Sequence, residues 1–250
     1  MGILKPTIII VPGSWQQVTA FRSFVSKLEN EGFPTIAIKL PSVGSTSGPP
    51  LPGLDADIAA VREVVTQTIE KSQEVILLCH SYGGLVGSNA AKGLDVHTRS
   101  KQGSLGGIKK IIFLSAFVIP SGKSLFDLLG GQPLPWMDVQ GDIVCAKKEK
   151  IAEIGFNDLS PEDAAKACLE MTHSSASTFL TPSNFEPWKN GISCDYVSTT
   201  EDNAIPHFQQ EIMAKQLGPK ANSVTLKSGH CAFLSIPDQL LKAIIRLSNM

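Results

Sequence analysis

Three residues of this sequence have the types that attack on a carbonyl by a serine requires: Ser81, Asp202 and His230. A serine hydroxyl is a poor nucleophile at neutral pH, so it needs an adjacent base, and the base needs a group that fixes its tautomer. We assign Ser81 as the nucleophile, His230 as the base and Asp202 as the orienting acid. Glu201 is the alternative acid, because it precedes Asp202 in the same turn.

The stretch around Ser81 indicates how the nucleophile is presented. Residues 75–78 form an apolar run of strand length, and Ser81 follows almost directly, with a glycine pair behind it. This is the context of a nucleophile elbow, in which a serine occupies a strained turn between a strand and a helix. Gly83 is expected where a side chain would collide with the neighbouring strand. Cys79 replaces the first glycine of the G-x-S-x-G pattern, and we expect its small side chain to be tolerated.

Acyl transfer also needs N–H donors for the oxyanion that develops in the tetrahedral intermediate. The backbone N–H of Tyr82, at the start of the helix after Ser81, is one candidate. The turn Pro12–Trp15 follows the first predicted strand, and the N–H of Ser14 in this turn is the second candidate. We therefore predict an oxyanion hole built from Ser14 and Tyr82.

The elements that position these residues alternate between strands and helices. Short apolar or β-branched runs predict strands at residues 7–11, 35–38, 75–78, 110–116, 194–198 and 223–226. Short connections between strands and helices indicate an α/β fold, with about six mostly parallel strands and helices on both faces. Ser81, Asp202 and His230 all follow strand ends, the edge at which such sheets bind ligands.

The alternation breaks between the fourth and fifth predicted strands. We assign residues 1–117 and 191–250 to the core and residues 118–190 to a helical lid within one single-domain unit. Helices are expected at residues 147–156 and from Ser160 onward, where Ser160 can cap and Pro161 suits the first helical position. The candidate pocket residues are Trp15, Phe126, Trp136, Met137, His173 and Phe179. Those from the lid are equally compatible with a lid core.

Two further segments lack a clear periodicity. Residues 40–53 are rich in proline, glycine and serine, and we interpret them as a surface connection, with a wall of the pocket mouth as the alternative. Residues 93–107 are polar and contain glycine, and we expect an exposed loop there.

Composition excludes several classes of function. The net charge is −1 without a basic run, which argues against nucleic acid as a partner. No apolar stretch approaches the roughly 18 residues of a membrane span. The five cysteines are scattered, so neither disulfides nor a zinc site is indicated, and no phosphate loop or dinucleotide fingerprint is present. We expect a cytoplasmic enzyme with no metal and no cofactor. A homodimer is the alternative to a monomer.

Taken together, several motifs resemble the α/β-hydrolase superfamily over the whole length of the chain. The sequence is most similar to the branch of plant methylesterases and hydroxynitrile lyases with its fungal and bacterial relatives. The matching segments are residues 12–15, 79–84, 157–164, 201–206, 208–209 and 229–230. The resemblance implies that Asp202 rather than Glu201 is the acid, that Ser14 and Tyr82 form the oxyanion hole, and that the substrate is a small ester of an aromatic or lipophilic acid.

Two departures from that branch bear on the reaction. Pro12 stands where these proteins usually have a histidine, and Cys231 stands where the lyases carry a lysine that handles cyanide. The second departure favours cleavage of a carboxylic ester, lactone or thioester over cyanohydrin cleavage. A lyase or cyclase that uses the same triad for acid–base chemistry is the first alternative. A small-molecule receptor on the same scaffold is the second.

Overall fold

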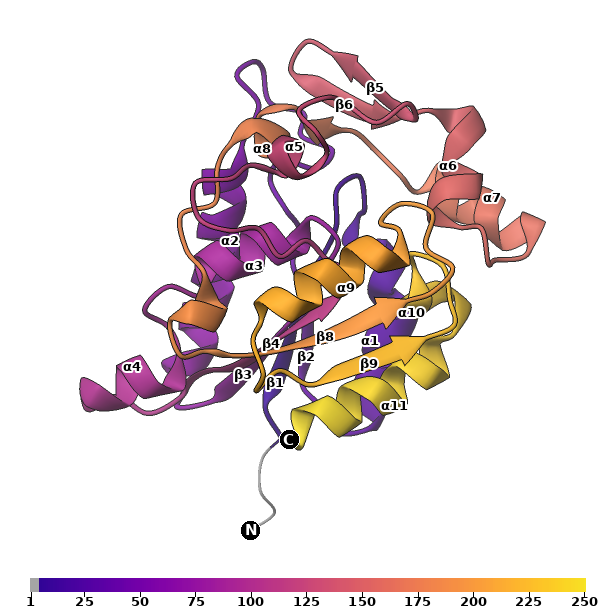
Figure 1. Cartoon of the computed structure of the whole chain (residues 1–250). Coiled ribbons are helices and arrows are strands. Elements are labelled where there is room, and N and C mark those ends of the chain that lie inside the picture. Colours follow the sequence, from indigo (N-terminus) through magenta and orange to yellow (C-terminus); the bar gives the residue numbers. More distant parts are fainter. Residues whose placement is uncertain (1–4) are drawn as a thin grey trace.

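A six-stranded parallel sheet forms the centre of the computed structural model, which describes residues 5–250 (Figure 1). Residues 1–4, at the start of the predicted core range, lie outside the described residues. The strand order is β2-β1-β3-β4-β8-β9, and every pairing between neighbours is parallel. The strands are β1 (Thr7–Val11), β2 (Thr35–Ala37), β3 (Glu74–His80), β4 (Gly107–Leu114), β8 (Ser193–Thr199) and β9 (Ser223–Leu226). The predicted sheet is confirmed.

Helices cover both faces of this sheet. Alternate side chains of its strands point to opposite faces, and each set packs into its own hydrophobic cluster. Ile9 and Val11 of β1 belong to the cluster beneath α2, α3 and α9, whereas Ile8 and Ile10 belong to the cluster beneath α1, α10 and α11. The helices are η1 (Val18–Phe21), α1 (Arg22–Asn30), α2 (Leu54–Ile69), α3 (Gly83–Ala90), α9 (His207–Gln216), α10 (Ala232–Ser235) and α11 (Pro237–Ser248).

The expected loop at residues 93–107 is partly helical, so that expectation was wrong. Residues Val96–Lys101 form α4, and Asp95 caps its N-terminus by accepting a hydrogen bond from the N–H of Thr98 at 2.9 Å. Arg99 and Lys101 lie in the last turn, where cations are favourable. The capping aspartate was the local signal for this helix.

Between β4 and β8 the chain leaves the sheet, and we call residues 115–192 the insertion. Helices were predicted at two places in it and are found there as α6 (Lys148–Gly155) and α7 (Pro161–Leu169), the latter capped by Ser160. The other elements are α5 (Leu125–Leu128), β5 (Met137–Gln140), β6 (Ile143–Ala146), β7 (Ser174–Ser175), α8 (Ser177–Leu180) and η2 (Pro187–Lys189).

A small antiparallel sheet of β5, β6 and β7 makes the insertion less purely helical than expected. Gly141 and Asp142 form the two-residue turn between β5 and β6, and Gly141 has a φ of +59°. A Gly-Asp pair between two short runs is a hairpin signal that the sequence offered. The hairpin lies at the outer end of the insertion (Figure 1).

Within residues 5–250, no helix combines the length and the apolar character needed to cross a lipid bilayer.

Candidate active site

The predicted nucleophile lies on a sharp turn between β3 and α3. Ser81 has a φ of +53°, a left-handed conformation that is strained for a non-glycine residue. Gly83 permits the turn, because a Cβ at this position would lie only 2.2 Å from the carbonyl oxygen of Val11. Cys79 is accommodated by Gly87 of α3, where a Cβ would meet its Sγ at 2.3 Å. Gly83 thus lets the start of α3 approach β1, and Gly87 lets α3 approach β3.

The predicted base and acid are in direct contact. Nδ1 of His230 lies 2.8 Å from Oδ2 of Asp202, and both side chains are buried. With Nδ1 occupied by the carboxylate, Nε2 is the nitrogen left to exchange a proton. His230 follows β9 and Asp202 follows β8, so neighbouring strands bring them together at the edge where Ser81 follows β3.

Asp202 is held rigidly in its turn. Its Oδ1 accepts hydrogen bonds of 2.8 Å from the N–H groups of Ala204 and Ile205, and Gln210 donates to its Oδ2 at 2.9 Å. Glu201, the alternative acid, points elsewhere and pairs loosely with Lys227 at 3.6 Å. The structure therefore brings Asp202, and not Glu201, to His230.

His80 packs beneath the turn. It is fully buried, and burial lowers its pKa well below the ordinary value, so the ring is neutral. Its Nε2 lies 3.0 Å from the backbone carbonyl oxygen of His230, which can only accept a hydrogen bond. Its Nδ1 lies 2.9 Å from Oε1 of Gln16, so the ring joins β3 to the turn after β1 and to the loop that carries the predicted base.

The two predicted oxyanion donors have no competing acceptor. Within residues 5–250, the backbone N–H groups of Ser14 and Tyr82 make no hydrogen bond to the protein. The adjacent turn is nevertheless fixed, because the N–H of Trp15 donates to Oγ of Ser174 at 2.8 Å and the Trp15 indole donates to the carbonyl of Val144 at 2.8 Å. Both bonds join the turn after β1 to the insertion.

A narrow cavity of about 40 Å³ lies over these groups. Its wall is almost entirely apolar and contains no Asp, Glu, Lys or Arg among the described residues. Residues from the predicted site that line it are Ser14, Trp15, Ser81, Trp136, Met137, Phe179 and His230. Further wall residues that the sequence did not single out include Phe117, Ile154, Phe156, Met171 and Ile205. Apolar residues spread over the insertion carry no local signal that separates a pocket wall from a core.

Two predicted pocket residues are not part of this wall. Phe126 packs against Phe179, with ring centroids 5.5 Å apart, and does not line the cavity. The ring of His173 reaches the backbone carbonyl of Ser45, 3.1 Å from its Nε2. Both residues were predicted to line the pocket, and the structure places them outside this wall, where each contacts a neighbour that only the tertiary structure supplies. The segment at residues 40–53, interpreted as a connection, contributes no residue to this wall either.

Comparison of the sequence with known protein families assigns the chain to one of them. A family model described as "Alpha/beta hydrolase family" matches residues 8–243 of the chain. The chain belongs to the alpha/beta hydrolase family.

Individual relatives agree with this assignment. "Alpha/beta hydrolase nvfD" of Aspergillus novofumigatus is 30% identical over 247 residues, which cover 97% of this chain and 96% of that protein. "Probable hydrolase R7" of a Phoma species is 28% identical over 262 residues, which cover 98% of this chain and 99% of that protein. "Putative methylesterase 11, chloroplastic" of Arabidopsis thaliana is 26% identical, with 90% of this chain matching 60% of that protein.

Solved structures share the fold of this alpha/beta hydrolase. The pyrethroid hydrolase PytH superposes with a TM-score of 0.78 at 21% identity, and each chain is covered to 98%. Polyneuridine aldehyde esterase superposes with a TM-score of 0.77 at 19% identity, with 98% of each chain covered. At these identities the likeness concerns the fold alone.

Sequence analysis missed a buried carboxylate beneath the elbow of this alpha/beta hydrolase. Asp57 of α2 is fully buried and accepts hydrogen bonds from the N–H of Ser42 at 2.9 Å, from its hydroxyl at 2.5 Å and from the phenol of Tyr82 at 2.8 Å. Burial raises the pKa of Asp57 more than these bonds lower it. The Asp57 carboxylate thus anchors the side chain of a predicted oxyanion residue.

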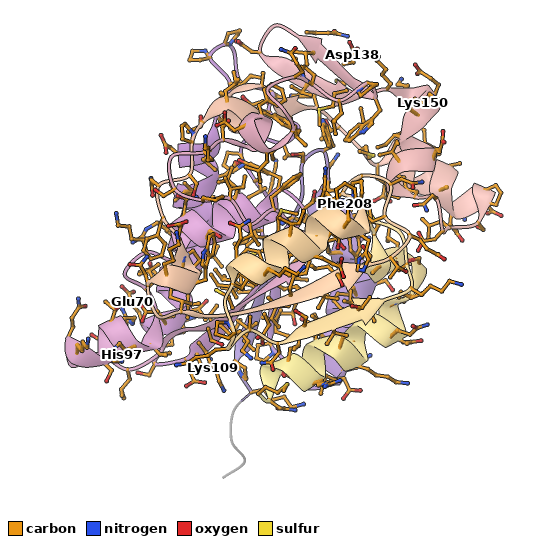
Figure 2. The ribbon with its side chains drawn as sticks, in the orientation of Figure 1. Glu70, His97, Lys109, Asp138, Lys150 and Phe208 are labelled. Carbon is orange, nitrogen blue, oxygen red and sulfur yellow. The ribbon has the colours of Figure 1, made fainter. Side chains whose placement is uncertain are left out.

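His97 lies far from these groups. It belongs to α4, at the opposite end of the molecule from Asp138 and Lys150 of the insertion (Figure 2). In the part of the chain that the structure describes, no group of three His, Cys, Asp or Glu side chains is arranged to hold a metal ion.

Proposed function

We propose that this alpha/beta hydrolase is a serine hydrolase that cleaves a small, uncharged carboxylic ester, lactone or thioester through an acyl-enzyme on Ser81. The observation that carries the proposal is the contact of His230 Nδ1 with Asp202 at 2.8 Å, with His230 and the strained Ser81 lining the same cavity. The names of relatives support it, since they include hydrolases and putative methylesterases.

The reaction begins when Oγ of Ser81 attacks the carbonyl carbon while Nε2 of His230 takes the hydroxyl proton. The imidazolium that forms is stabilised by Asp202, which stays ionised. The unoccupied N–H groups of Ser14 and Tyr82 receive the oxyanion, and each such donor contributes about 2.7–4 kcal/mol in comparable sites.

Collapse of this intermediate breaks the ester bond, and His230 gives its proton to the leaving oxygen, or to the leaving sulfur of a thioester. A water molecule then attacks the acyl-enzyme as His230 removes one of its protons. The second collapse releases the carboxylic acid and returns the proton to Oγ of Ser81. No metal or cofactor is needed to balance these steps.

The apolar cavity wall favours a substrate whose acyl group is uncharged and lipophilic or aromatic. A carboxylate or ammonium on the acyl side would be desolvated without a partner there, at a cost of several kcal/mol. The cavity of about 40 Å³ is also far smaller than the roughly 300–1,000 Å³ of typical ligand sites, so the closed wall accepts only a small group.

The test is hydrolysis of p-nitrophenyl esters of increasing acyl length by the wild type, Ser81→Ala and Ser88→Ala. Ser88 is a matched control, because it is buried in α3 and its hydroxyl has no partner among the described residues. We expect Ser81→Ala to lose at least about 10³-fold in kcat and Ser88→Ala to keep it. The length optimum measures the accessible cavity.

Labelling with a fluorophosphonate separates the alternatives. The probe forms a phosphorus–oxygen bond with Oγ of Ser81 and expels fluoride, and we expect it on the wild type but not on Ser81→Ala. Full turnover by Ser81→Ala would refute the proposal. Labelling without turnover of any ester would favour the lyase or cyclase, and tight ligand binding without labelling or turnover would favour the receptor.

A further inference from the structure

A turn of the insertion is bonded to both loops that carry the predicted acid and base. The turn joins α6 to α7 and is closed by a hydrogen bond of 3.1 Å from the N–H of Leu159 to the carbonyl of Phe156. Its two central residues are Asn157 and Asp158, and we call residues 156–159 the clasp turn. Because Ser160 caps α7 immediately afterwards, the clasp turn is held between two helices.

Asp158 makes the contact to the loop before His230. Its Oδ2 accepts a hydrogen bond of 2.7 Å from the N–H of Gly229 and one of 3.0 Å from the hydroxyl of Ser228. Ser228 and Gly229 are the two residues that precede His230 in the chain and are buried. Hydrogen bonds from neutral donors to an ionised carboxylate are stronger than those between neutral groups. Asp158 therefore fixes the backbone from which the predicted base projects.

Two further bonds join the insertion to the Asp202 loop. Nδ2 of Asn157 donates to the carbonyl of Glu201 at 2.8 Å, and Nδ2 of Asn203 donates to the carbonyl of Glu153, on α6, at 2.8 Å. The two loops are themselves joined, since the N–H of Glu201 donates to the carbonyl of Ser228 at 2.9 Å. The insertion thus contacts the residues on either side of Asp202 as well as those before His230.

The clasp turn packs closely against Gly229, and one carboxylate oxygen of Asp158 lacks a hydrogen-bond partner there. A Cβ at Gly229 would lie 2.5 Å from Oδ1 of Asn157 and 2.6 Å from Oδ1 of Asp158, so only glycine lets the clasp turn approach this closely. Oδ1 of Asp158 is buried and has no hydrogen-bond partner within residues 5–250. Burying an unpartnered carboxylate oxygen costs free energy, which the two bonds to Oδ2 must offset.

The same turn also closes the cavity. Phe156 is buried and lines both the narrow cavity over Ser81 and a larger open cavity of about 490 Å³. Gln16 and Met171 are shared between the two cavities in the same way. A displacement of the clasp turn would withdraw Phe156 from this boundary and break the Asp158 bonds together.

We propose that Asp158 is a positioning residue for His230, which couples closure of the insertion over the cavity to assembly of the Ser81–His230–Asp202 site. This inference rests on the proposed function, since it assigns to His230 the role of base. Substrate enters while the clasp turn is displaced. When it returns, Asp158 fixes Gly229 and Phe156 seals the wall in one movement.

The experiment compares Asp158→Ala, Asp158→Asn and Glu162→Gln in p-nitrophenyl acetate hydrolysis, with thermal unfolding of each variant. Asp158→Ala removes both acceptor bonds, and we expect kcat to fall about ten- to a hundredfold with KM little changed. Asp158→Asn can keep its oxygen at the Oδ2 position, where it accepts both bonds, so we expect it to retain most of the activity. Glu162 is a matched control, because it is an exposed acid of α7 that pairs with Lys166 at 2.8 Å and with no other cation among residues 5–250.

Gly229→Ala perturbs the same contact from the opposite side. The new methyl group must push aside the ends of two side chains, so we expect the variant to fold and to resemble Asp158→Ala. In the double variant the two losses should be less than additive, because each breaks the same contact.

The outcomes separate this inference from the proposed function. Wild-type kcat in Asp158→Ala, with Ser81→Ala inactive, would overturn the role of Asp158 and leave the serine mechanism intact. Equal loss in Asp158→Ala and Asp158→Asn, with a lowered unfolding temperature in both, would also overturn it, because the residue would then be needed for the fold. An active Ser81→Ala would remove the proposed function itself.

Discussion

Replacing Tyr82 by phenylalanine tests how the carboxylate beneath the elbow is stabilised. The substitution removes one hydroxyl from a fully buried site and leaves the aromatic ring in place. Asp57 keeps its two bonds from Ser42 and loses the one of 2.8 Å from Tyr82. Among the described residues no Lys, Arg or His pairs with Asp57, so nothing else compensates its charge.

The expected cost follows from the kind of bond that is lost. A hydrogen bond to a charged group contributes about 1.5–3 kcal/mol, and the small void left by one oxygen adds little. The free energy of unfolding should therefore fall by about 2 kcal/mol at pH 7.5. For a chain of this size each kcal/mol lowers the unfolding temperature by about 2–4 °C.

The pH dependence gives the prediction a sign. Folding raises the pKa of Asp57 above 3.8, its value in the unfolded chain. The protonated carboxyl therefore stabilises the fold fully below pH 3.8, and this contribution is lost as pH rises through the folded-state pKa. The Tyr82 hydroxyl lowers that pKa, so its removal raises the pKa further. The difference in stability between the wild type and Tyr82→Phe should therefore grow with rising pH and shrink as pH falls toward 4.

Urea denaturation at several pH values measures this effect. In an Asp57→Asn background the same hydroxyl meets a neutral amide, and its removal should cost only about 1 kcal/mol. The reasoning would be refuted if Tyr82→Phe matched the wild type to within about 0.5 kcal/mol at pH 7.5, or if the loss were the same in both backgrounds.

Two further predictions concern the acid and a buried ion pair. Asp202→Asn should keep the fold and lower kcat by about 10³–10⁴-fold, whereas Glu201→Gln should hydrolyse esters at the wild-type rate; the reverse pattern would make Glu201 the acid. Lys110 Nζ lies 2.6 Å from the fully buried Asp195. Lys110→Met removes this cation and leaves the carboxylate of Asp195 uncompensated, so it should lower the free energy of unfolding by about 3–5 kcal/mol. Lys109→Met is its matched control, since the exposed Lys109 pairs with Glu74 only at 3.5 Å, and it should cost at most about 1 kcal/mol in the same denaturation experiment.

The sequence by itself determined the sheet, the order of its elements and the turn at Ser81. These features are local, because a buried parallel strand is a short apolar run and a strained turn needs Gly83 at a fixed offset from Ser81. Family resemblance added the choice of Asp202 over Glu201. Residues 157–159 of the clasp turn lie within a segment that the resemblance had marked, but nothing in the sequence indicated that Asp158 contacts Gly229.

Only the tertiary structure decided what the side chains touch. Adjacent residues of a loop point in different directions, so the contact of Asp202 with His230 depends on the whole turn that Gln210 and two backbone N–H groups hold in place. The assignment of His173 outside the cavity, the bond from Tyr82 to Asp57 and the bond from Gly229 to Asp158 join segments between 25 and 128 residues apart. Periodicity carries no information about such pairs, because it records which face of an element is buried and not which partner buries it.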